Sequence, residues 1–270
     1  MRYNARTVQV VYSSYNNTDT NNRLNAQPNK PLTPIDNTTA NAVITVDPSI
    51  TYQPWLGFGG SIEHDSIWEL NRLSAADKAS ALDALFNPAT GNNYNLMRLA
   101  NACPDFCPDY NSSISPDKGY WTYDDMPAGQ TDPGLTNFSI QRDLNMGVIS
   151  TLQQVLQINP NVKFYASMWS PPAWMKDNGK IVDGGHVLPQ YYNALANYYV
   201  KYIQAYKAQG IPIYAVTLQN EPDISVGYPS TLWTTDEQMN FAQTLGQTFA
   251  ANNIKTKIWG LDANEHVTFD

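Results

Sequence analysis

Ala215-Val216-Thr217-Leu218-Gln219-Asn220-Glu221-Pro222 joins an apolar run to an amide and a carboxylic acid, and the proline then ends the run. The apolar part is typical of a buried strand. In proteins built from alternating strands and helices, ligands bind and reactions occur at the carboxyl ends of the strands. Glu221 is therefore the best single candidate for a catalytic group, and its expected partner is a second carboxylate.

The surrounding sequence alternates between strand and helix patterns. Apolar runs predict strands at 93–99, 162–168, 211–218 and 257–261, after a first strand that Gly57-Phe58-Gly59-Gly60 closes. Between them, helical spacing of apolar residues predicts helices at 75–86, capped by Ser74, at 144–156 and at 195–206, and a further helix capped by Thr235. Regular alternation favours a parallel sheet. Periodicity alone does not separate an open parallel sheet from a closed barrel. A closed barrel needs eight strands, and only about five are found, so we expect the sequence to be cut short.

The first fifty residues have a different pattern. Residues 7–12 and 42–46 have strand composition and flank a polar stretch, 13–41, that we expect to be an extended loop. We interpret this front segment, which has no helical pattern, as part of an all-β accessory element.

Composition excludes several classes of protein. The chain has 270 residues, of which 42% are hydrophobic, 15% charged and 12% aromatic, and its net charge is −8. An acidic chain does not suit a nucleic-acid partner, whereas many aromatic and few charged residues suit neutral polar ligands such as sugars. No apolar run approaches the length of a membrane span. The start, residues 1–6, lacks the apolar core of a signal peptide.

Two cysteines, Cys103 and Cys107, lie close together in the sequence. They could form a local disulfide in an oxidising compartment or remain free thiols. Two cysteines alone do not make a metal site, and the sequence implies no metal or cofactor.

The ends of the expected strands offer a consistent set of residues: Gly59 and Gly60, Arg98, Trp169 with Ser170, Asn220 with Glu221, and Asp262. We expect these side chains to converge on one rim of the sheet. A carboxylic acid partly buried beside a tryptophan keeps its proton more readily, which suits a general acid. The structural alternative is an interior salt bridge between Glu221 and Arg98.

Three further groups allow two interpretations each. Trp169 and Trp174 could form a platform for a sugar ring or belong to the core. Asp124 and Asp125 could face a ligand or cap a loop. Glu63-His64-Asp65 could relay protons, although a lone histidine is more often structural.

Together these motifs resemble glycoside hydrolase family 30, which includes glucosylceramidases and β-1,6-glucanases. The matching pieces are Gly57-Phe58-Gly59-Gly60-Ser61, Asn95-Leu96-Met97-Arg98, Tyr123-Asp124-Asp125, residues 167–176 and Gln219-Asn220-Glu221-Pro222. The resemblance covers nearly all of this chain, but only the first part of a family member. It implies that residues 1–50 are strands of an accessory β-sandwich and that residues 51–270 are part of a (β/α)8 barrel. It also implies a retaining double displacement.

The resemblance also implies roles for individual residues. Glu221 is then the acid/base, and Asn220 orients the nucleophile or binds the sugar 2-hydroxyl. Trp169, Asp125 and Arg98 fall where the family binds or shapes the glycone subsite. The nucleophile would lie on the order of a hundred residues beyond Glu221, so we expect it to be absent from this chain. The insertion near 108–120 puts the family's substrate preference in doubt.

We therefore expect the amino-terminal portion of a retaining O-glycoside hydrolase that acts on β-glucosides, either glucosylceramide-like lipids or β-glucans. Without a nucleophile, the portion alone should have little or no activity. The alternative is a non-catalytic carbohydrate-binding module derived from a truncated barrel. The resemblance further implies secretion.

Overall fold

A computed structural model describes residues 7–13, 25–31, 44–108 and 119–264. The chain divides into two compact units, residues 1–54 and residues 55–270.

The first unit contains a pair of antiparallel strands, β1 (Thr7–Tyr12) and β2 (Asn25–Pro31). β1 was expected, but the strand predicted at 42–46 is wrong, because residues 44–46 have no regular structure and 42–43 lie outside the described residues. β2 instead falls within the predicted loop. Its sequence, NAQPNKP, is polar and mostly exposed, so it lacks the apolar pattern that indicates a strand. The strand is defined by its backbone pairing with β1. The accessory β-sandwich stays a prediction.

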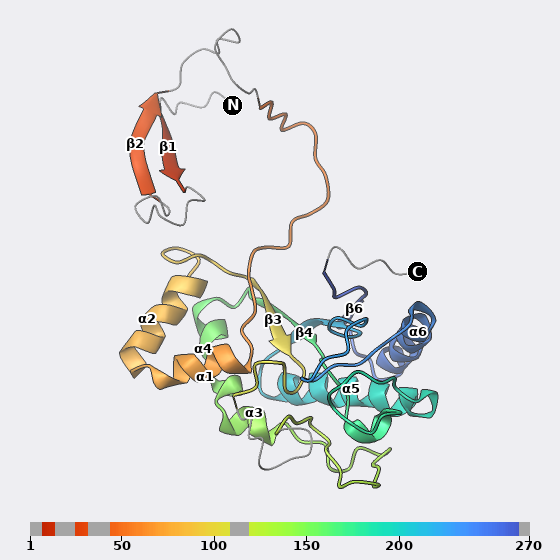
Figure 1. Cartoon of the computed structure of the whole chain (residues 1–270). Coiled ribbons are helices and arrows are strands. Elements are labelled where there is room, and N and C mark those ends of the chain that lie inside the picture. Colours follow the sequence, from red (N-terminus) through yellow and green to blue (C-terminus); the bar gives the residue numbers. More distant parts are fainter. Residues whose placement is uncertain (1–6, 14–24, 32–43, 109–118, 265–270) are drawn as a thin grey trace. The chain divides into compact units, whose positions relative to one another are not determined.

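The second unit is built on a four-stranded parallel sheet (Figure 1). Its strands, in spatial order, are β3 (Leu96–Ala100), β4 (Lys163–Ser167), β5 (Ile213–Thr217) and β6 (Lys257–Trp259). All four were expected. They are short, and β4 alternates buried and half-buried residues: Phe164 and Ala166 are fully buried, whereas Lys163 and Tyr165 are half-buried, so one face of this strand is covered more completely than the other.

The expected first strand is only partly formed. Residues 58–62 run beside β3, where the carbonyl of Phe58 accepts from the amide of Leu96 at 3.2 Å and that of Gly60 from Arg98 at 2.9 Å. A single parallel bridge joins Ser61 to Arg98, and no strand is assigned. Gly59 is required here, since a Cβ at this position would lie 1.7 Å from the carbonyl oxygen of Leu96.

Helices lie in two groups, as Figure 1 shows. Beside β3 are α1 (His64–Arg72), α2 (Ala75–Phe86), α3 (Gln141–Asn145) and α4 (Val148–Ile158); toward β6 are α5 (Tyr192–Ala208) and α6 (Thr235–Ala251). Short 3-10 turns, η2 (Ala173–Met175) and η3 (Pro189–Tyr191), precede α5.

Three details of the helices differ from the sequence predictions. α1 was not expected. The helix predicted at 144–156 is two helices, because Gly147 takes a left-handed φ of 76° between them. α6 is capped by Thr234 rather than Thr235, and Glu237 completes a reciprocal capping box. The expected cap of α2 is confirmed, since Ser74 accepts from the amide of Asp77.

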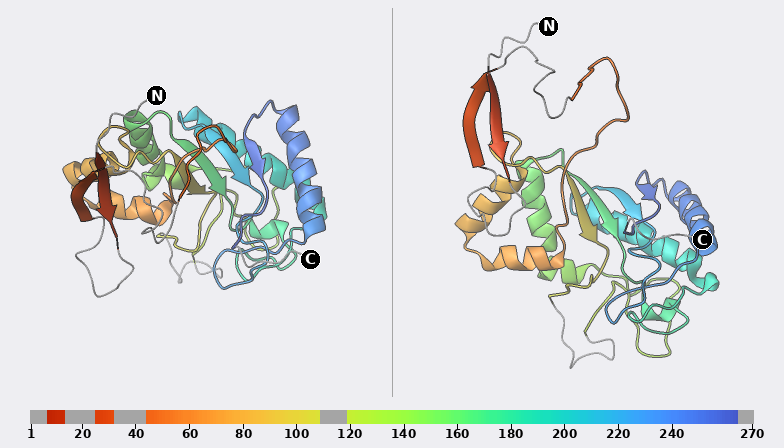
Figure 2. Two further views of the ribbon diagram at one scale, coloured as in Figure 1. Left: turned by 90° about the horizontal axis from the view of Figure 1, so that it is seen from above. Right: turned by 45° about the horizontal axis from the view of Figure 1, so that its top comes forward.

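The core lies between the sheet and these helices, and α5 contributes much of it. Tyr198, Tyr199, Tyr202 and Tyr206 of this helix are all fully buried. The two views in Figure 2 show α6 beside the β6 end of the sheet, and its Phe241 packs against Tyr199 with ring centroids 6.0 Å apart. The sheet is therefore held rigidly from the helix side, while its carboxyl-end loops carry the polar side chains.

Candidate active site

Arg98 connects the carboxyl ends of three parallel segments. From the middle of β3, its Nη1 lies 3.0 Å from Oε1 of Glu63, and its Nη2 lies 3.0 Å from Oδ2 of Asp262. The same Nη2 donates to the side-chain oxygen of Asn220 at 2.6 Å. A guanidinium has five N–H donors in a fixed plane, which suits it to this bridging role. We call Arg98, Glu63, Asn220 and Asp262 the Arg98 cluster.

Burial and charge act in opposite directions in this cluster. Burial raises the pKa of Glu63, while the Ser61 hydroxyl and the charge of Arg98 lower it in part. Burial alone would lower the pKa of Arg98, but the charges of Asp262 and Glu63 raise it overall. The cation is thus stabilised by two carboxylates, and each carboxylate depends on the cation.

Glu221 lies at the rim outside these ion pairs. The ion pairs of Arg98 in the described part of the chain are with Glu63 and Asp262, so the predicted alternative, a salt bridge to Glu221, is not formed. The Glu221 amide donates to the carbonyl of Asp262 at 2.7 Å, and Asn264 donates to its carboxylate at 3.0 Å. Its side chain is half-buried.

The backbone of Glu221 is unusual. Its φ is 46°, in the left-handed region that residues other than glycine enter rarely. Such conformations cost free energy and concentrate at functional sites. The strand end is fixed on both sides, because the amide of Asn220 donates to Met168 of β4's end and that of Glu221 to the segment after β6. The carboxylate is therefore presented from a well-defined turn.

Side-chain oxygen atoms of Asn220 and Asp262 accept hydrogen bonds from residues of the sheet. Arg98 binds the Asn220 oxygen, which leaves the amide nitrogen to face a ligand. Asp262 accepts from Arg98 and Thr217, and also from Ser167. Asp262 is therefore an internal acceptor that ties β4, β5 and β6 together.

Trp169 is nearly buried, with 5% of its surface exposed, and the Arg98 guanidinium lies 4.5 Å from its ring centroid. One face of the ring is thus covered by a cation. Trp174 lies edge-on against Tyr191, and its Nε1 donates to the carbonyl of Asp124. Both rings take part in packing, and a sugar-binding role for Trp169 stays a prediction.

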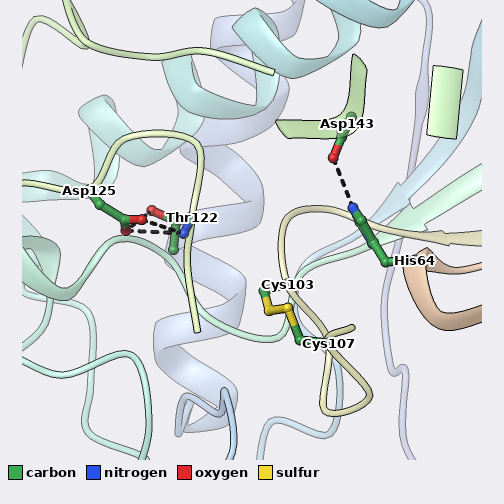
Figure 3. Close-up of a disulfide and its surroundings, with 6 residues drawn as sticks. All are labelled: His64, Cys103, Cys107, Thr122, Asp125 and Asp143. Carbon is green, nitrogen blue, oxygen red and sulfur yellow. Dashed lines mark hydrogen bonds and ion pairs between the residues drawn. A yellow bond between two sulfur atoms is a disulfide. The ribbon is translucent and has the colours of Figure 1, made fainter. Parts of the chain in front are cut away.

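The two aspartates of the loop after β3 differ. Asp125 is exposed, and its carboxylate accepts from the backbone amide and the hydroxyl of Thr122, as Figure 3 shows. These contacts match the loop-cap interpretation, and its glycone role also stays a prediction. Asp124 is 1% exposed, and neither of its carboxylate oxygens has a hydrogen-bond partner. Burial, followed by the charge of Asp132, raises its pKa to about 6.

His64 belongs to a buried network rather than to a proton relay with Glu63 and Asp65. Its Nε2 lies 2.9 Å from Asp143 (Figure 3), which also accepts from the hydroxyls of Tyr123 and Tyr206 at 2.6 Å each. Glu63 turns instead to Arg98. The structural interpretation of this histidine is therefore favoured.

Cys103 and Cys107 form a disulfide that closes a short loop after β3 (Figure 3). The loop carries Asp105, a residue that the sequence-based site omitted. Burial raises the pKa of Tyr228, and the charges of Glu221 and Asp105 raise it further. The position of Asp105 between two cysteines, directly after a strand, was the available signal.

The described residues contain no group of three or more histidine, cysteine, aspartate or glutamate side chains placed to hold a metal ion. In the same part of the chain, no helix has the length and apolarity needed to cross a membrane.

Comparison with known proteins identifies the barrel. The pattern of the glycosyl hydrolase family 30 TIM-barrel domain matches residues 56–267. An endo-1,6-β-D-glucanase of Trichoderma harzianum is 35% identical over 225 residues, covering 78% of this chain and 44% of that protein. The lysosomal acid glucosylceramidase of Mus musculus is 30% identical over 230 residues, covering 82% of this chain and 42% of that protein.

Solved structures agree with this assignment. The structure of an endo-β-1,6-glucanase superimposes with a TM-score of 0.68 and 31% identity, covering 80% of this chain and 46% of that one. The chain thus spans less than half the length of the relatives it matches. The family pattern covers most of the parallel sheet and its rim, and the chain belongs to glycosyl hydrolase family 30.

Proposed function

We propose that this chain supplies the acid/base half of a retaining glycoside hydrolase that acts on β-linked glucosides, with Glu221 as the acid/base. The observation that carries the proposal is the separation of two kinds of carboxylate. Glu63 and Asp262 neutralise Arg98, whereas Glu221 follows β5 in a strained turn and stays outside those pairs.

In the proposed reaction, Glu221 protonates the leaving oxygen while a second carboxylate attacks the anomeric carbon. A covalent glycosyl-enzyme forms, and the leaving sugar departs as an alcohol. Glu221 then takes a proton from water, which cleaves the intermediate and restores both carboxyl groups. Retaining enzymes hold the two carboxyl groups about 5–5.5 Å apart. We propose that chain following residue 270 supplies the second one.

Arg98 and Asn220 support this step in the proposal. Arg98 fixes the Asn220 oxygen at 2.6 Å, so that the amide nitrogen can donate to a sugar hydroxyl. The guanidinium also neutralises Glu63 and Asp262 at the rim, so neither carboxylate is left as an unpaired buried charge.

Among substrates, β-1,6-glucan is the first to test. Three endo-1,6-β-D-glucanases match at 33–35% identity, compared with 30% for the mouse glucosylceramidase. We also propose that the protein is secreted, which the Cys103–Cys107 disulfide supports, because disulfides persist in oxidising compartments.

The test is an assay of the complete gene product containing this chain on β-1,6-glucan, glucosylceramide and xylan. The anomer released first is recorded by NMR. Release of the β-anomer of glucose from β-1,6-glucan supports the proposal. Release of the α-anomer contradicts retention, and binding of glucan without cleavage favours the non-catalytic carbohydrate-binding alternative.

A further inference from the structure

Gln219 precedes the candidate acid/base, Glu221, and its side chain binds the backbone on both sides of the rim. The side chain is buried, and its Nε2 donates to two backbone carbonyls, that of Trp169 at 2.7 Å and that of Asn220 at 2.8 Å. Its Oε1 accepts from the indole Nε1 of Trp233 at 3.3 Å. A glutamine amide has two donor hydrogens and one acceptor oxygen, so these three bonds use both donors and the oxygen.

The bond to the Asn220 carbonyl acts on the peptide unit that joins Asn220 to Glu221. The oxygen of this unit accepts from Gln219, and its nitrogen, which belongs to Glu221, donates to the carbonyl of Asp262 at 2.7 Å. Both polar atoms of one peptide unit are therefore tethered. Because a peptide unit is planar, it rotates as one body, and that rotation changes the φ of Glu221. The two bonds thus hold this angle at its left-handed value of 46°.

Gln219 is itself fixed by Trp233, which connects the turn to α6. The buried ring of Trp233 packs against Phe241 of this helix with centroids 5.2 Å apart. The backbone amide of Trp233 also donates to the carbonyl of Pro222 at 2.8 Å, directly after Glu221. The contacts of Gln219 therefore rest on a packed helix, and side chains locked in this way hold a functional group more precisely than a free loop does.

We propose that Gln219 is a positioning residue, which keeps Glu221 in its left-handed turn and thereby aims the carboxyl group at the leaving oxygen. The inference rests on the proposed function, since it takes Glu221 as the acid/base. A left-handed φ at a residue other than glycine persists only where surrounding contacts impose it. Without the Gln219 side chain, the peptide unit before Glu221 loses the donor to its oxygen, and the turn relaxes to a conformation that moves the carboxyl group.

The first experiment measures the kinetics of the complete gene product with Gln219→Met, which keeps an unbranched side chain of similar length but has no hydrogen-bond donor. A general acid must lie within hydrogen-bond reach of its substrate, so we expect kcat on β-1,6-glucan to fall about 10²-fold while KM stays within about twofold. Formation of the glycosyl-enzyme from a dinitrophenyl β-glucoside, whose leaving group needs no proton, should keep nearly the parent rate. Gln153→Met is the matched control, because Gln153 on α4 also donates to a backbone carbonyl, that of Gln209 at 2.9 Å.

The second experiment measures the turn without catalysis, by hydrogen–deuterium exchange of the same proteins. Peptides that cover residues 219–224 follow the amide of Glu221, which is bonded to the Asp262 carbonyl. Gln219→Met should speed this exchange about tenfold, as expected for the loss of one buried hydrogen bond, while exchange in α5 keeps the parent rate. Gln153→Met should leave the turn unchanged. Trp233→Phe, which keeps a ring but removes the indole donor, should act on both readouts in the same direction as Gln219→Met and decides if that variant does not fold.

Equal loss of activity on the two substrates overturns the positioning role, because Gln219 would then act on folding alone. Parent kcat on β-1,6-glucan in Gln219→Met, or parent exchange at the turn, overturns it as well. Glu221→Gln is assayed in parallel. If Glu221→Gln loses β-1,6-glucan hydrolysis and Gln219→Met retains it, the inference fails and the proposed function stands. Full activity of Glu221→Gln overturns both.

Discussion

Arg98 of β3 and Asn220 at the end of β5 are joined by a 2.6 Å hydrogen bond across 122 positions of sequence. The bond passes over β4, which lies between these strands in the sheet. The same guanidinium pairs with two carboxylates, so the rim is organised around one cation.

Replacement of Arg98 should destabilise the fold. Arg98→Gln leaves Glu63 and Asp262 without their cation, and removal of one partner of a buried ion pair costs about 3–5 kcal/mol. Urea denaturation measures the loss in the free energy of unfolding. Arg72→Gln is the matched control, since its pair with Glu69 is exposed and should contribute less than about 1 kcal/mol. Equal effects of the two changes would contradict the proposed role.

Asp124 should make stability depend on pH. Its pKa of about 6 in the folded chain lies above the ordinary value of 3.8, chiefly because of burial. The folded chain therefore binds this proton more tightly than the unfolded chain does. The stabilisation of the fold by this proton is complete below about pH 4 and is lost as the pH rises through about 6. Asp124→Asn should remove that decline and stabilise the chain at pH 7 by about 1–2 kcal/mol, less than the full shift because solvent screens part of it.

The measurement for Asp124 is the urea midpoint of parent and variant from pH 3.5 to pH 7. Asp183→Asn serves as control, because Asp183 is an exposed aspartate paired only loosely with Lys180 at 3.2 Å. Parallel pH curves for the parent and Asp124→Asn would show that this carboxyl group does not titrate as inferred.

The tyrosines of α5 offer a test of the Asp143 network. Tyr206 and Tyr202 are both fully buried, but the Tyr206 hydroxyl donates to Asp143, while the Tyr202 hydroxyl has no hydrogen-bond partner among the described residues. Tyr206→Phe should lower the free energy of unfolding by about 1.5–3 kcal/mol, as for a bond to a charged group. Tyr202→Phe should have no effect or stabilise. A larger loss for Tyr202→Phe is the contrary result.

Reduction of the disulfide should also lower stability. Cys103 and Cys107 close a short loop, for which chain entropy gives roughly 2 kcal/mol. Urea denaturation with and without a reductant measures the difference. The double variant Cys103→Ala/Cys107→Ala is the control and should not respond to the reductant. A response of equal size in that variant would assign the effect to something other than this bond.

Much of the sheet could be predicted from the sequence. The short apolar run that contains Phe164 and Ala166 forms a strand whose apolar residues are buried, and this pattern is local to the run. β2 could not be predicted, since its polar residues pair through backbone atoms that carry no sequence signal. Residues 57–60 show the intermediate case: the sequence predicted that they close a first strand, and the segment does run beside β3, but only a single bridge, from Ser61 to Arg98, forms.

For the candidate site, the sequence likewise predicted which residues lie at the strand ends but not how their side chains pair. The strand-end position of Glu221 and its neighbour Asn220 followed from the local pattern, and Arg98 was recognised as a member of the rim. The pairing of Arg98 with Glu63, and of His64 with Asp143, depends on contacts between residues 35 and 79 positions apart. No local periodicity specifies such partners, so they required the structure.

Glu221 as the acid/base is the central claim, and the dependence of cleavage on the leaving group tests it most directly. In the complete enzyme, Glu221→Gln should slow hydrolysis of β-1,6-glucan by about 10²–10⁴-fold, because its leaving alcohol needs a proton. Cleavage of a dinitrophenyl β-glucoside, whose leaving group needs none, should form the glycosyl-enzyme at nearly the parent rate. Equal loss on both substrates, or full activity of Glu221→Gln on β-1,6-glucan, would contradict the account.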